Sequence, residues 1–448
     1  MRLVVLGAAE SGVGAAILAR REGYDVFVSD MGTIKPRYKA LLDSHSIPWE
    51  EGGHTPELLL SADEVVKSPG IPPTAPLVAQ LIHQGTPILS EIEFAARYTD
   101  ARMICITGSN GKTTTTSLIH HICRKAGMDV GLAGNIGHSL ALQVAETPHA
   151  NYVIELSSFQ LDNMYDFRAH IAVLLNITPD HLDRYDYRMQ GYVDSKMRIT
   201  RNQQRGDTLV YWLGDDYIPA ELTAHPSEAL RCGFSDALTD GAAAYASADG
   251  LLVVTAPVHF EMPLSQLSLP GRHNLRNCMA AAIACLAAGV SPDVVRQGLS
   301  DFPGVEHRLE KAGDARGIHF VNDSKATNVD ACYCALDSMT TPVVLIVGGK
   351  DKGNDYTQIM PLVRQKCRAI VYLGADNTKL HDNFDALSLP TADTHSMADC
   401  VKACLSLAHK GDTVLLSPCC ASFDLFKNME DRGEQFKALV RSLEAQEA

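Results

Sequence analysis

The sequence lacks a long apolar segment, a C-x-x-C pair and an excess of positive charge. Its longest apolar helix, expected at about residues 279–290, is too short to span a bilayer. The N-terminus leads into a strand and a turn instead of the apolar segment of a signal peptide. The twelve cysteines favour reduced, buried thiols over disulfides or zinc ligands, and a net charge of −14 argues against a nucleic-acid or anionic-membrane surface. These absences predict a soluble, cytoplasmic protein.

The length and the pattern of apolar residues predict the domain organisation. With 448 residues, of which 46% are hydrophobic and 21% charged, the chain is globular and long enough for about three domains. Short apolar runs alternate with helical patterns, which predicts α/β domains with mainly parallel sheets. We expect a Rossmann-like N-terminal domain at 1–93, a central P-loop ATPase-like domain at 94–301 and a Rossmann-like C-terminal domain at 302–448.

The stretch MICITGSNGKTTTT at residues 103–116 predicts a buried strand, a glycine turn and the start of a helix. In this order the N–H groups of the turn and the helix N-terminus attract phosphate, Lys112 contacts phosphate oxygens and Thr113 can bind magnesium. Only two residues separate the glycines, where the general P-loop pattern has four, so the structural alternative is a glycine hairpin with an incidental lysine. The order of elements favours a nucleoside triphosphate site.

A second glycine turn follows the first strand of the chain. Gly7, Gly12 and Gly14 precede and open a helix, and the next strand ends at Asp30, which is typical of a dinucleotide site. Ala9 stands where the second glycine of that fingerprint belongs, so NAD is weakly supported. We expect a Rossmann-like domain for another diphosphate, with Asp30 accepting hydrogen bonds from a base or sugar. The turn at 68–72 is either an ordinary turn or part of this site.

Polar residues follow several strands of the central segment. Glu155 ends one predicted strand, and Asp180 and His181 follow the next, where an open α/β sheet binds its ligands. These three residues form a plausible metal-binding set around ATP. Asn135 lies in a glycine-rich turn, where turn chemistry is the alternative. Nothing in its spacing marks Lys196, which by itself is a solvated helix residue.

Further polar groups occur later in the sequence. Asn274 and Asn277 lie on one face of a helix start, where capping by Asn274 is the alternative. Beyond residue 302, the stretches 322–328, 348–353 and 417–424 each end a predicted strand. Their lysines and hydroxyls suit a small anionic ligand.

The chain resembles the Mur ligases of peptidoglycan synthesis over its whole length, through the motifs TGSNGKTT, GNIG, ELSSFQL, TPDHLDRY, HN-x-x-N, HR, NDSKATN, GGKDKG and SP-x-x-ASFD. ELSSFQL, NDSKATN and SP-x-x-ASFD are the specific motifs. They resemble the branch that adds D-glutamate, not those that add L-alanine, a diamino acid or a dipeptide. GSNGKTT alone would not separate the chain from folylpolyglutamate synthase.

The resemblance implies an ATP-dependent amide ligase. ATP would phosphorylate the terminal carboxylate of UDP-N-acetylmuramoyl-L-alanine, and the amine of D-glutamate would attack the acyl phosphate. Positive charge must then converge on the transferring group. The resemblance also implies two Mg²⁺ ions and a carbamate on Lys196, where added CO2 turns a cation into a carboxylate. We expect a monomer.

The resemblance further implies a set of site residues. The catalytic residues would be Lys112, Glu155, His181 and Lys196, and the metal ligands Thr113, Glu155, His181 and carbamylated Lys196. ATP would contact Gly108, Ser109, Asn110, Gly111, Lys112, Thr113, Thr114, Asn274, Asn277, His307, Arg308 and Asp323. The UDP-sugar would contact Asp30, Ser68, Gly70, Asn135, Ser157 and His181. D-Glutamate would contact Lys325, Thr327, Lys352 and Ser422.

Two residues depart from the family pattern. Ala9 replaces a glycine of the N-terminal turn, and Met429 stands where the family often has an aromatic residue near the D-glutamate site. A folate polyglutamating ligase is an alternative within the superfamily, but it would have no use for the uridine-type N-terminal domain. A nucleotide-switch or NAD-sensing protein is an alternative of another class, and the set Glu155, Asp180 and His181 argues for chemistry instead.

Overall fold

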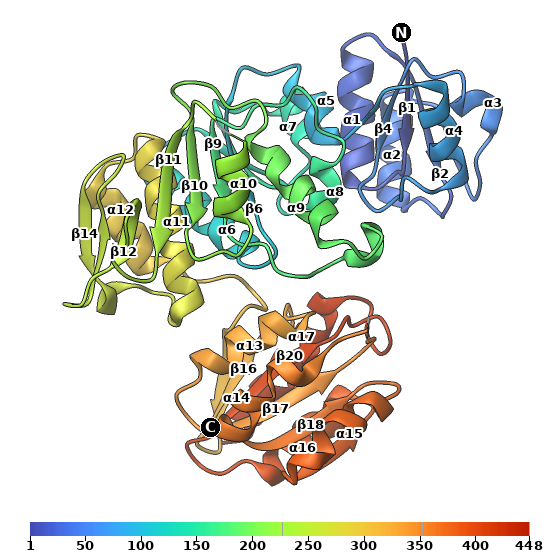
Figure 1. Cartoon of the computed structure of the whole chain (residues 1–448). Helices are drawn as coiled ribbons and strands as arrows, with labels where there is room; N and C mark the ends of the chain where they lie inside the picture. Colours follow the sequence, from blue (N-terminus) through green and yellow to red (C-terminus); the bar gives the residue numbers. More distant parts are fainter. Residues whose placement is uncertain (226, 352, 448) are drawn as a thin grey trace. The chain divides into compact units, whose positions relative to one another are not determined.

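The computed structural model describes residues 1–225, 227–351 and 353–447, and its strands form three sheets flanked by helices (Figure 1). Most neighbouring strands run parallel, so the predicted α/β class is confirmed. Contacts within the chain define two compact units, one of residues 1–268 and 276–302 and the other of residues 269–275 and 303–448. The first unit contains the first two sheets, and the second unit contains the third. Eleven of the twelve cysteines are buried thiols.

The first sheet has five parallel strands in the order β3-β2-β1-β4-β5. Its central strands are continuous apolar runs because helices cover both faces. The strands are β1 (Arg2–Leu6), β2 (Asp25–Asp30), β3 (Trp49–Glu51), β4 (Glu64–Lys67) and β5 (Ile88–Leu89). The helices are α1 (Glu10–Arg21), α2 (Pro36–Ser44), α3 (Pro56–Leu59), α4 (Pro76–Gln84) and α5 (Glu91–Ala96).

The second sheet has nine strands in the order β14-β13-β12-β11-β10-β9-β6-β8-β7, in which the pairs β12–β13 and β13–β14 are antiparallel and the other pairs are parallel. The parallel strands are β6 (Arg102–Thr107), β7 (Val130–Gly134), β8 (Asn151–Glu155), β9 (Ile171–Leu174), β10 (Thr208–Trp212), β11 (Leu230–Ser235) and β12 (Ala242–Ala246). The antiparallel hairpin is β13 (Leu251–Val254) and β14 (Phe260–Pro263). The helices are α6 (Lys112–Lys125), α7 (Leu140–Glu146), α8 (Ser158–Leu161), α9 (Met189–Met197), α10 (Ile218–Ala224), α11 (Arg272–Ala287) and α12 (Pro292–Asp301).

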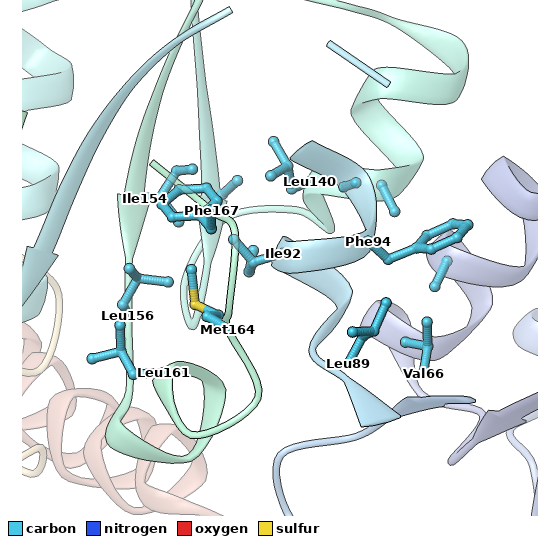
Figure 2. Close-up of a cluster of buried hydrophobic side chains, with 14 of the residues drawn as sticks. Val66, Leu89, Ile92, Phe94, Leu140, Ile154, Leu156, Leu161, Met164 and Phe167 are labelled. Carbon is cyan, nitrogen blue, oxygen red and sulfur yellow. The ribbon is translucent and has the colours of Figure 1, made fainter. Parts of the chain in front are cut away.

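The first two sheets share one hydrophobic cluster. Figure 2 shows Phe94 of α5 on the side of Leu89 and Val66, whereas Ile92 of the same helix faces Met164 and the second sheet. All five side chains are almost fully buried. The helix α5 therefore joins the two sheets through apolar contacts on two of its faces. The boundary at residue 93 stays a prediction, and it falls inside α5.

The third sheet has six strands in the order β15-β16-β20-β17-β18-β19, with only β15 antiparallel. The strands are β15 (Glu310–Ala315), β16 (Ile318–Asn322), β17 (Val343–Gly348), β18 (Cys367–Leu373), β19 (Thr391–Thr394) and β20 (Thr413–Cys419). The helices are α13 (Val329–Ser338), α14 (Met360–Lys366), α15 (Thr378–Phe384), α16 (Met397–Leu407) and α17 (Met429–Glu447). Separate apolar clusters lie on the two faces of this sheet.

Candidate active site

The phosphate loop lies between β6 and α6, in the predicted order of strand, turn and helix. Gly111 is the N-cap of α6 with a φ of 84°, and a Cβ at this position would lie 2.4 Å from Asn277 Oδ1, so glycine is required. Lys112 Nζ donates to the carbonyl oxygens of Gly108 (2.8 Å) and Ser109 (2.9 Å). The helix N-terminus and the ammonium group together give this loop a positive potential.

A second loop, after β9, fixes the phosphate loop by reciprocal hydrogen bonds. Asn176 Oδ1 accepts from Asn110 N (2.8 Å), and Asn176 Nδ2 donates to the Asn110 carbonyl (3.0 Å). Ser109 Oγ donates to the Thr178 carbonyl (2.8 Å), and Thr178 N donates to Ser109 Oγ (2.9 Å). Sequence analysis missed Asn176. Its position directly after a strand that neighbours β6 is the signal that could have identified it.

Glu155 is the last residue of β8, and it is 1% exposed. Its Oε1 accepts from Asn135 Nδ2 (2.8 Å), whereas the buried Oε2 has no hydrogen-bond partner within the described part of the chain. A buried carboxylate oxygen without a donor is costly unless a cation neutralises it. Since Mg²⁺ prefers oxygen ligands, Glu155 fits the predicted magnesium site, and Thr113 supplies a hydroxyl in the first turn of α6.

Lys196 on α9 is 1% exposed, although the pattern of residues around it in the sequence gives no indication of burial. Its Nζ donates to the carbonyl of Gly108 (2.8 Å) and lies 4.6 Å from the centre of the Tyr192 ring. Burial, together with the positive charge of Lys112, lowers the pKa of Lys196 well below its usual range. Lys196 therefore loses its proton more readily than an exposed lysine, and it shares one carbonyl acceptor of the phosphate loop with Lys112.

His181 and Asp180 follow β9. The backbone of His181 is left-handed (φ 52°), and its Nε2 lies 3.7 Å from Asp180 Oδ2. The imidazole ring packs against Phe159 in a T-shaped arrangement, with ring centres 5.1 Å apart. The negative charges of Asp180 and Glu155 both act on Lys196. Glu155 and Asp180 thus both lie close enough to Lys196 to act on its charge, and they lie at the end of β8 and after β9, the two strands that flank β6.

The glycines of the N-terminal turn lie where two close contacts require them. A Cβ on Gly12 would lie 1.9 Å from the carbonyl oxygen of Gly7, which seats α1 on β1. A Cβ on Gly14 would lie 2.0 Å from Ser139 Oγ at the start of α7. Packing therefore explains the part of the dinucleotide fingerprint that the sequence retains.

Asp30 ends β2 and accepts hydrogen bonds from two backbone N–H groups, one in the N-terminal glycine turn and one just after β2. Its Oδ2 accepts from Ala8 N (2.7 Å), and its Oδ1 accepts from Gly32 N (2.8 Å). Ser157 also has a local role, because it caps α8 in a reciprocal capping box with Gln160. These contacts orient both residues at the C-terminal ends of their strands.

Ser68 and Gly70 belong to the turn after β4. Ser68 Oγ is buried and, among the described residues, has no hydrogen-bond partner. A Cβ on Gly7 would lie 2.4 Å from this oxygen, so the two turns pack directly on each other. An unpaired buried hydroxyl at the end of a parallel strand is available to a ligand.

In the second unit, Asp323 is fully buried after β16. Its Oδ2 accepts from Ser417 Oγ (2.9 Å), its Oδ1 accepts from Leu309 N (3.2 Å), and Arg308 Nη1 lies 3.7 Å away. Burial raises the pKa of Asp323 to about 6 in spite of the Arg308 charge.

Asn274 is inside the first turn of α11 instead of at its cap, and its Nδ2 donates to the carbonyl of Pro270 (2.8 Å).

The residues expected to bind D-glutamate follow β16, β17 and β20. Lys325 and Thr327 are in one loop, in which Thr327 N donates to the Lys325 carbonyl (3.0 Å), and Ser422 is 2% exposed in another. Lys352 lies outside the described residues. Since parallel strands end at the same edge of a sheet, these loops are neighbours, as the bridge between Lys350 and Ala421 shows.

Arg432 of α17 connects these three loops, and sequence analysis missed it. The guanidinium group is 1% exposed and donates to the carbonyl oxygens of Ser324 (2.8 Å), Cys420 (3.2 Å) and Gly348 (3.5 Å). Burial lowers the pKa of Arg432 to about 10. An arginine in a mixed helix gives no local signal, because its partners are up to 108 residues away.

Glu306, His307 and Glu434 form a cluster of three groups that could ligate a metal. Lys437 Nζ already lies within it, 2.7 Å from Glu434 and in contact with Glu306. The cluster is therefore an ion-pair network that fixes α17 beside His307.

The chain matches three domain descriptions in order: "MurD N-terminal domain" over residues 2–77, "Mur ligase middle domain" over residues 106–285, and "Mur ligase, glutamate ligase domain" over residues 307–420. The chain belongs to the Mur ligase family, and the resemblance seen in its motifs is confirmed at this level.

Individual relatives extend over the full chain. A Bacteroides fragilis protein named UDP-N-acetylmuramoylalanine–D-glutamate ligase is 63% identical over 99% of this chain and 100% of its own length. A Porphyromonas gingivalis protein of the same name is 55% identical over 98% of both chains. The solved UDP-N-acetylmuramate-alanine ligase of Thermotoga maritima is similar in fold, with a TM-score of 0.61 and 18% identity over 99% of each chain. Among the described residues, no helix combines the length and apolarity needed to cross a membrane.

Proposed function

We propose that the protein is an ATP-dependent amide ligase that joins D-glutamate to UDP-N-acetylmuramoyl-L-alanine through an acyl phosphate. The observation that carries this proposal is the convergence of Lys112 and buried Lys196 on the carbonyl of Gly108. Glu155, whose Oε2 has no hydrogen-bond partner among the described residues, is close enough to act on the charge of Lys196. Full-length identity of 55–63% to proteins named for this activity supports the choice of substrates. Peptidoglycan precursor synthesis in the cytoplasm, by a monomer, is part of the proposal.

Each unit has a separate task in this proposal. In the first unit, residues 108–114 and Asn277 bind ATP, and Asp30, Ser68, Gly70, Asn135, Ser157 and His181 contact the UDP-sugar. In the second unit, Lys325, Thr327, Lys352 and Ser422 bind D-glutamate, and Asn274, His307, Arg308 and Asp323 are assigned to the nucleotide. We keep 1–93, 94–301 and 302–448 as the boundaries of three domains.

The chain's own groups account for phosphoryl transfer between two anions. Lys112 exchanges the carbonyls of Gly108 and Ser109 for phosphate oxygens of ATP, and the N-terminus of α6 stabilises the charge that develops there. His181, between Asp180 and Phe159, positions the substrate carboxylate. Bound Mg²⁺, with Thr113, Glu155 and His181 as the proposed ligands, would supply further positive charge to the phosphates.

The surroundings of Lys196 support its carbamylation. Carbon dioxide reacts with a neutral amine, and burial increases the neutral fraction of Lys196. The resulting carboxylate would give a second magnesium ion an oxygen ligand. It would also replace the repulsion between Lys196 and Lys112 with an attraction.

Phosphate release from ATP tests the proposed function. With UDP-N-acetylmuramoyl-L-alanine present, release should depend on D-glutamate and should be absent with L-glutamate or L-lysine. Release that ignores the identity of the amino acid would remove the ligase assignment. Release with a folate in place of the UDP-sugar would favour the polyglutamating alternative.

A further inference from the structure

The turn after β4, residues 68–71, which we name the 68–71 loop, contacts two cationic side chains from different parts of the first unit. Lys67 Nζ donates to the carbonyl oxygens of Ile71 (2.7 Å) and Ser68 (3.4 Å). Arg184, from the segment after β9, donates to the carbonyl oxygens of Gly70 (3.3 Å), Pro69 (3.4 Å) and Ile71 (3.5 Å). Every carbonyl of the loop therefore accepts from at least one of these two side chains, and that of Ile71 accepts from both.

This arrangement directs the two sides of the loop differently. Its carbonyl oxygens face Lys67 and Arg184, whereas the Ser68 hydroxyl is buried against Gly7 without a hydrogen-bond partner among the residues described. Ser68 N donates to the carbonyl of Leu6 (2.8 Å), which fixes the start of the loop to β1. The loop is thus oriented by its acceptors, and the hydrogen-bonding capacity of the Ser68 hydroxyl is unused within the described part of the chain.

Holding the two positive charges of Lys67 and Arg184 close together at the 68–71 loop is electrostatically unfavourable, which favours a functional role for their contacts. Lys67 is 5% exposed, and burial together with the charge of Arg184 lowers the pKa of Lys67 to about 8, opposed by the carboxylate of Asp162. Both cations line a cavity of about 870 Å³, and their polar groups donate to the carbonyls of one short loop.

Arg184 also links this loop to His181. Its guanidinium carbon lies 4.3 Å from the centre of the Phe159 ring, and that ring packs against His181 in a T-shaped arrangement. The guanidinium group therefore stacks on the ring that orients His181 and donates to the loop that contains Ser68. Two proposed contacts of the UDP-sugar, on different sheets, share one connecting side chain.

We propose that Lys67 and Arg184 are positioning residues for the UDP-sugar, which fix the 68–71 loop of the first sheet in register with His181 of the second. The inference rests on the proposed substrate site. Lys67 precedes the loop directly and contacts it locally, whereas Arg184 approaches from a segment more than 100 residues away and connects the loop to a distant part of the chain.

Steady-state kinetics of Arg184→Lys and Lys67→Met test the proposal. At position 184, lysine keeps the positive charge but lacks the planar guanidinium group with its several N–H donors. At position 67, methionine is an unbranched side chain of similar length without a hydrogen-bond donor. Each variant should raise KM for UDP-N-acetylmuramoyl-L-alanine roughly tenfold, the order expected for hydrogen bonds from a charged donor, and leave KM for ATP unchanged. Because the two residues share the Ile71 carbonyl, the double variant should show a non-additive effect.

Arg198→Lys is the matched control. Arg198 lines the same cavity, donates to the carbonyls of Leu161 (2.9 Å) and Met164 (3.3 Å), and lies over the Tyr165 ring, but these partners are outside the 68–71 loop. It should leave KM for the UDP-sugar unchanged. An equal rise in this control, or parallel rises in KM for ATP, would show a general structural effect and overturn the proposal.

Ser68→Ala separates this inference from the proposed function. If KM for the UDP-sugar rises in Ser68→Ala but not in the Arg184 and Lys67 variants, the loop binds substrate and the positioning role is wrong. If Ser68→Ala changes nothing, the substrate assignment of the loop fails, and the inference fails with it. Protection of each variant against thermal unfolding by the UDP-sugar gives the same comparison as a binding measurement without turnover.

Discussion

At the scale of single residues, burial sets the chemistry of the site more than sequence spacing does. Lys196 and Lys112 donate to the same carbonyl, that of Gly108, but only Lys196 is removed almost completely from water. Burial lowers the pKa of Lys196 well below its usual range, whereas the side chain of Lys112 is only partly buried. Lys112 suits a phosphate contact, which needs charge, whereas Lys196 suits a reaction that needs a free electron pair.

Replacing Lys196 tests this distinction. Lys196→Ala should reduce turnover by about two orders of magnitude or more, which is the effect expected when a group that stabilises the transition state electrostatically is removed. A small carboxylate such as acetate should restore part of the turnover. In the wild-type protein, ¹³C-labelled bicarbonate should give a carbamate carbonyl NMR signal without any substrate. That signal should be absent in Lys196→Ala.

Lys125→Ala is the control for this experiment. Lys125 lies at the far end of α6, where it forms a salt bridge with Asp301 (2.7 Å). It should keep the labelled signal and full turnover. Full activity in Lys196→Ala, or acetate stimulation of the Lys125 variant as well, would contradict the assignment.

At the scale of elements, the sequence predicts best what neighbouring residues determine. The strand, turn and helix around Lys112 follow from apolar runs and glycines within fourteen residues, and the structure has that order. Asn176 and Arg432 could not be predicted in this way, because their partners are set by sheet topology. Lys196 needed the fold as well, since only packing distinguishes it from a solvated helix lysine.

The helix α17 illustrates an element that acts at a distance. Arg432 donates to carbonyls in all three loops that were expected to bind D-glutamate. Arg432→Lys keeps the charge but cannot reach three loops, so KM for D-glutamate should rise roughly tenfold while KM for the UDP-sugar stays constant. Steady-state kinetics with each substrate varied in turn measure this difference.

Arg368→Lys is the matched control for α17. Arg368 forms a two-point ion pair with the buried carboxylate of Asp412 (2.5 and 3.2 Å), next to the N-terminal ends of β18 and β20 in the same sheet. The two variants should lower the unfolding temperature of the protein, but only Arg432→Lys should change KM for D-glutamate. Equal KM values in both variants would leave Arg432 with a purely structural role.

At the scale of the whole molecule, the first two sheets belong to one compact unit. They share an apolar cluster, and a buried carboxylate of α5 adds a polar connection. Glu91 Oε1 accepts from Ser139 Oγ (2.7 Å) and from Ala141 N (2.6 Å), both at the start of α7. Burial raises the pKa of Glu91 to about 7. The connection between the sheets therefore titrates near neutral pH.

The sign of this titration predicts how stability changes with pH. Between pH 4.5 and 7 the folded protein binds a proton at Glu91 that the unfolded chain has released, so the free energy of unfolding falls as pH rises. Glu91→Gln keeps a hydrogen-bond acceptor and cannot ionise. Relative to this variant, the free energy of unfolding of the wild type should fall by about 3 kcal/mol across this range.

Tryptophan fluorescence during urea unfolding at pH 5 and pH 8 measures this loss. The sequence has two tryptophans, Trp49 and Trp212, and both belong to the first unit, so the signal reports on that unit alone. Parallel pH dependence in the wild type and Glu91→Gln would exclude Glu91 as the titrating group.

The contact between Gly14 and Ser139 limits how this chain can be recombined with its relatives. A donor segment grafted onto positions 1–93 must carry glycine at position 14, or else bring its own version of the start of α7. The N-terminal part is therefore not an interchangeable module, and chimaeras that join two homologues should be designed with their crossover after α7.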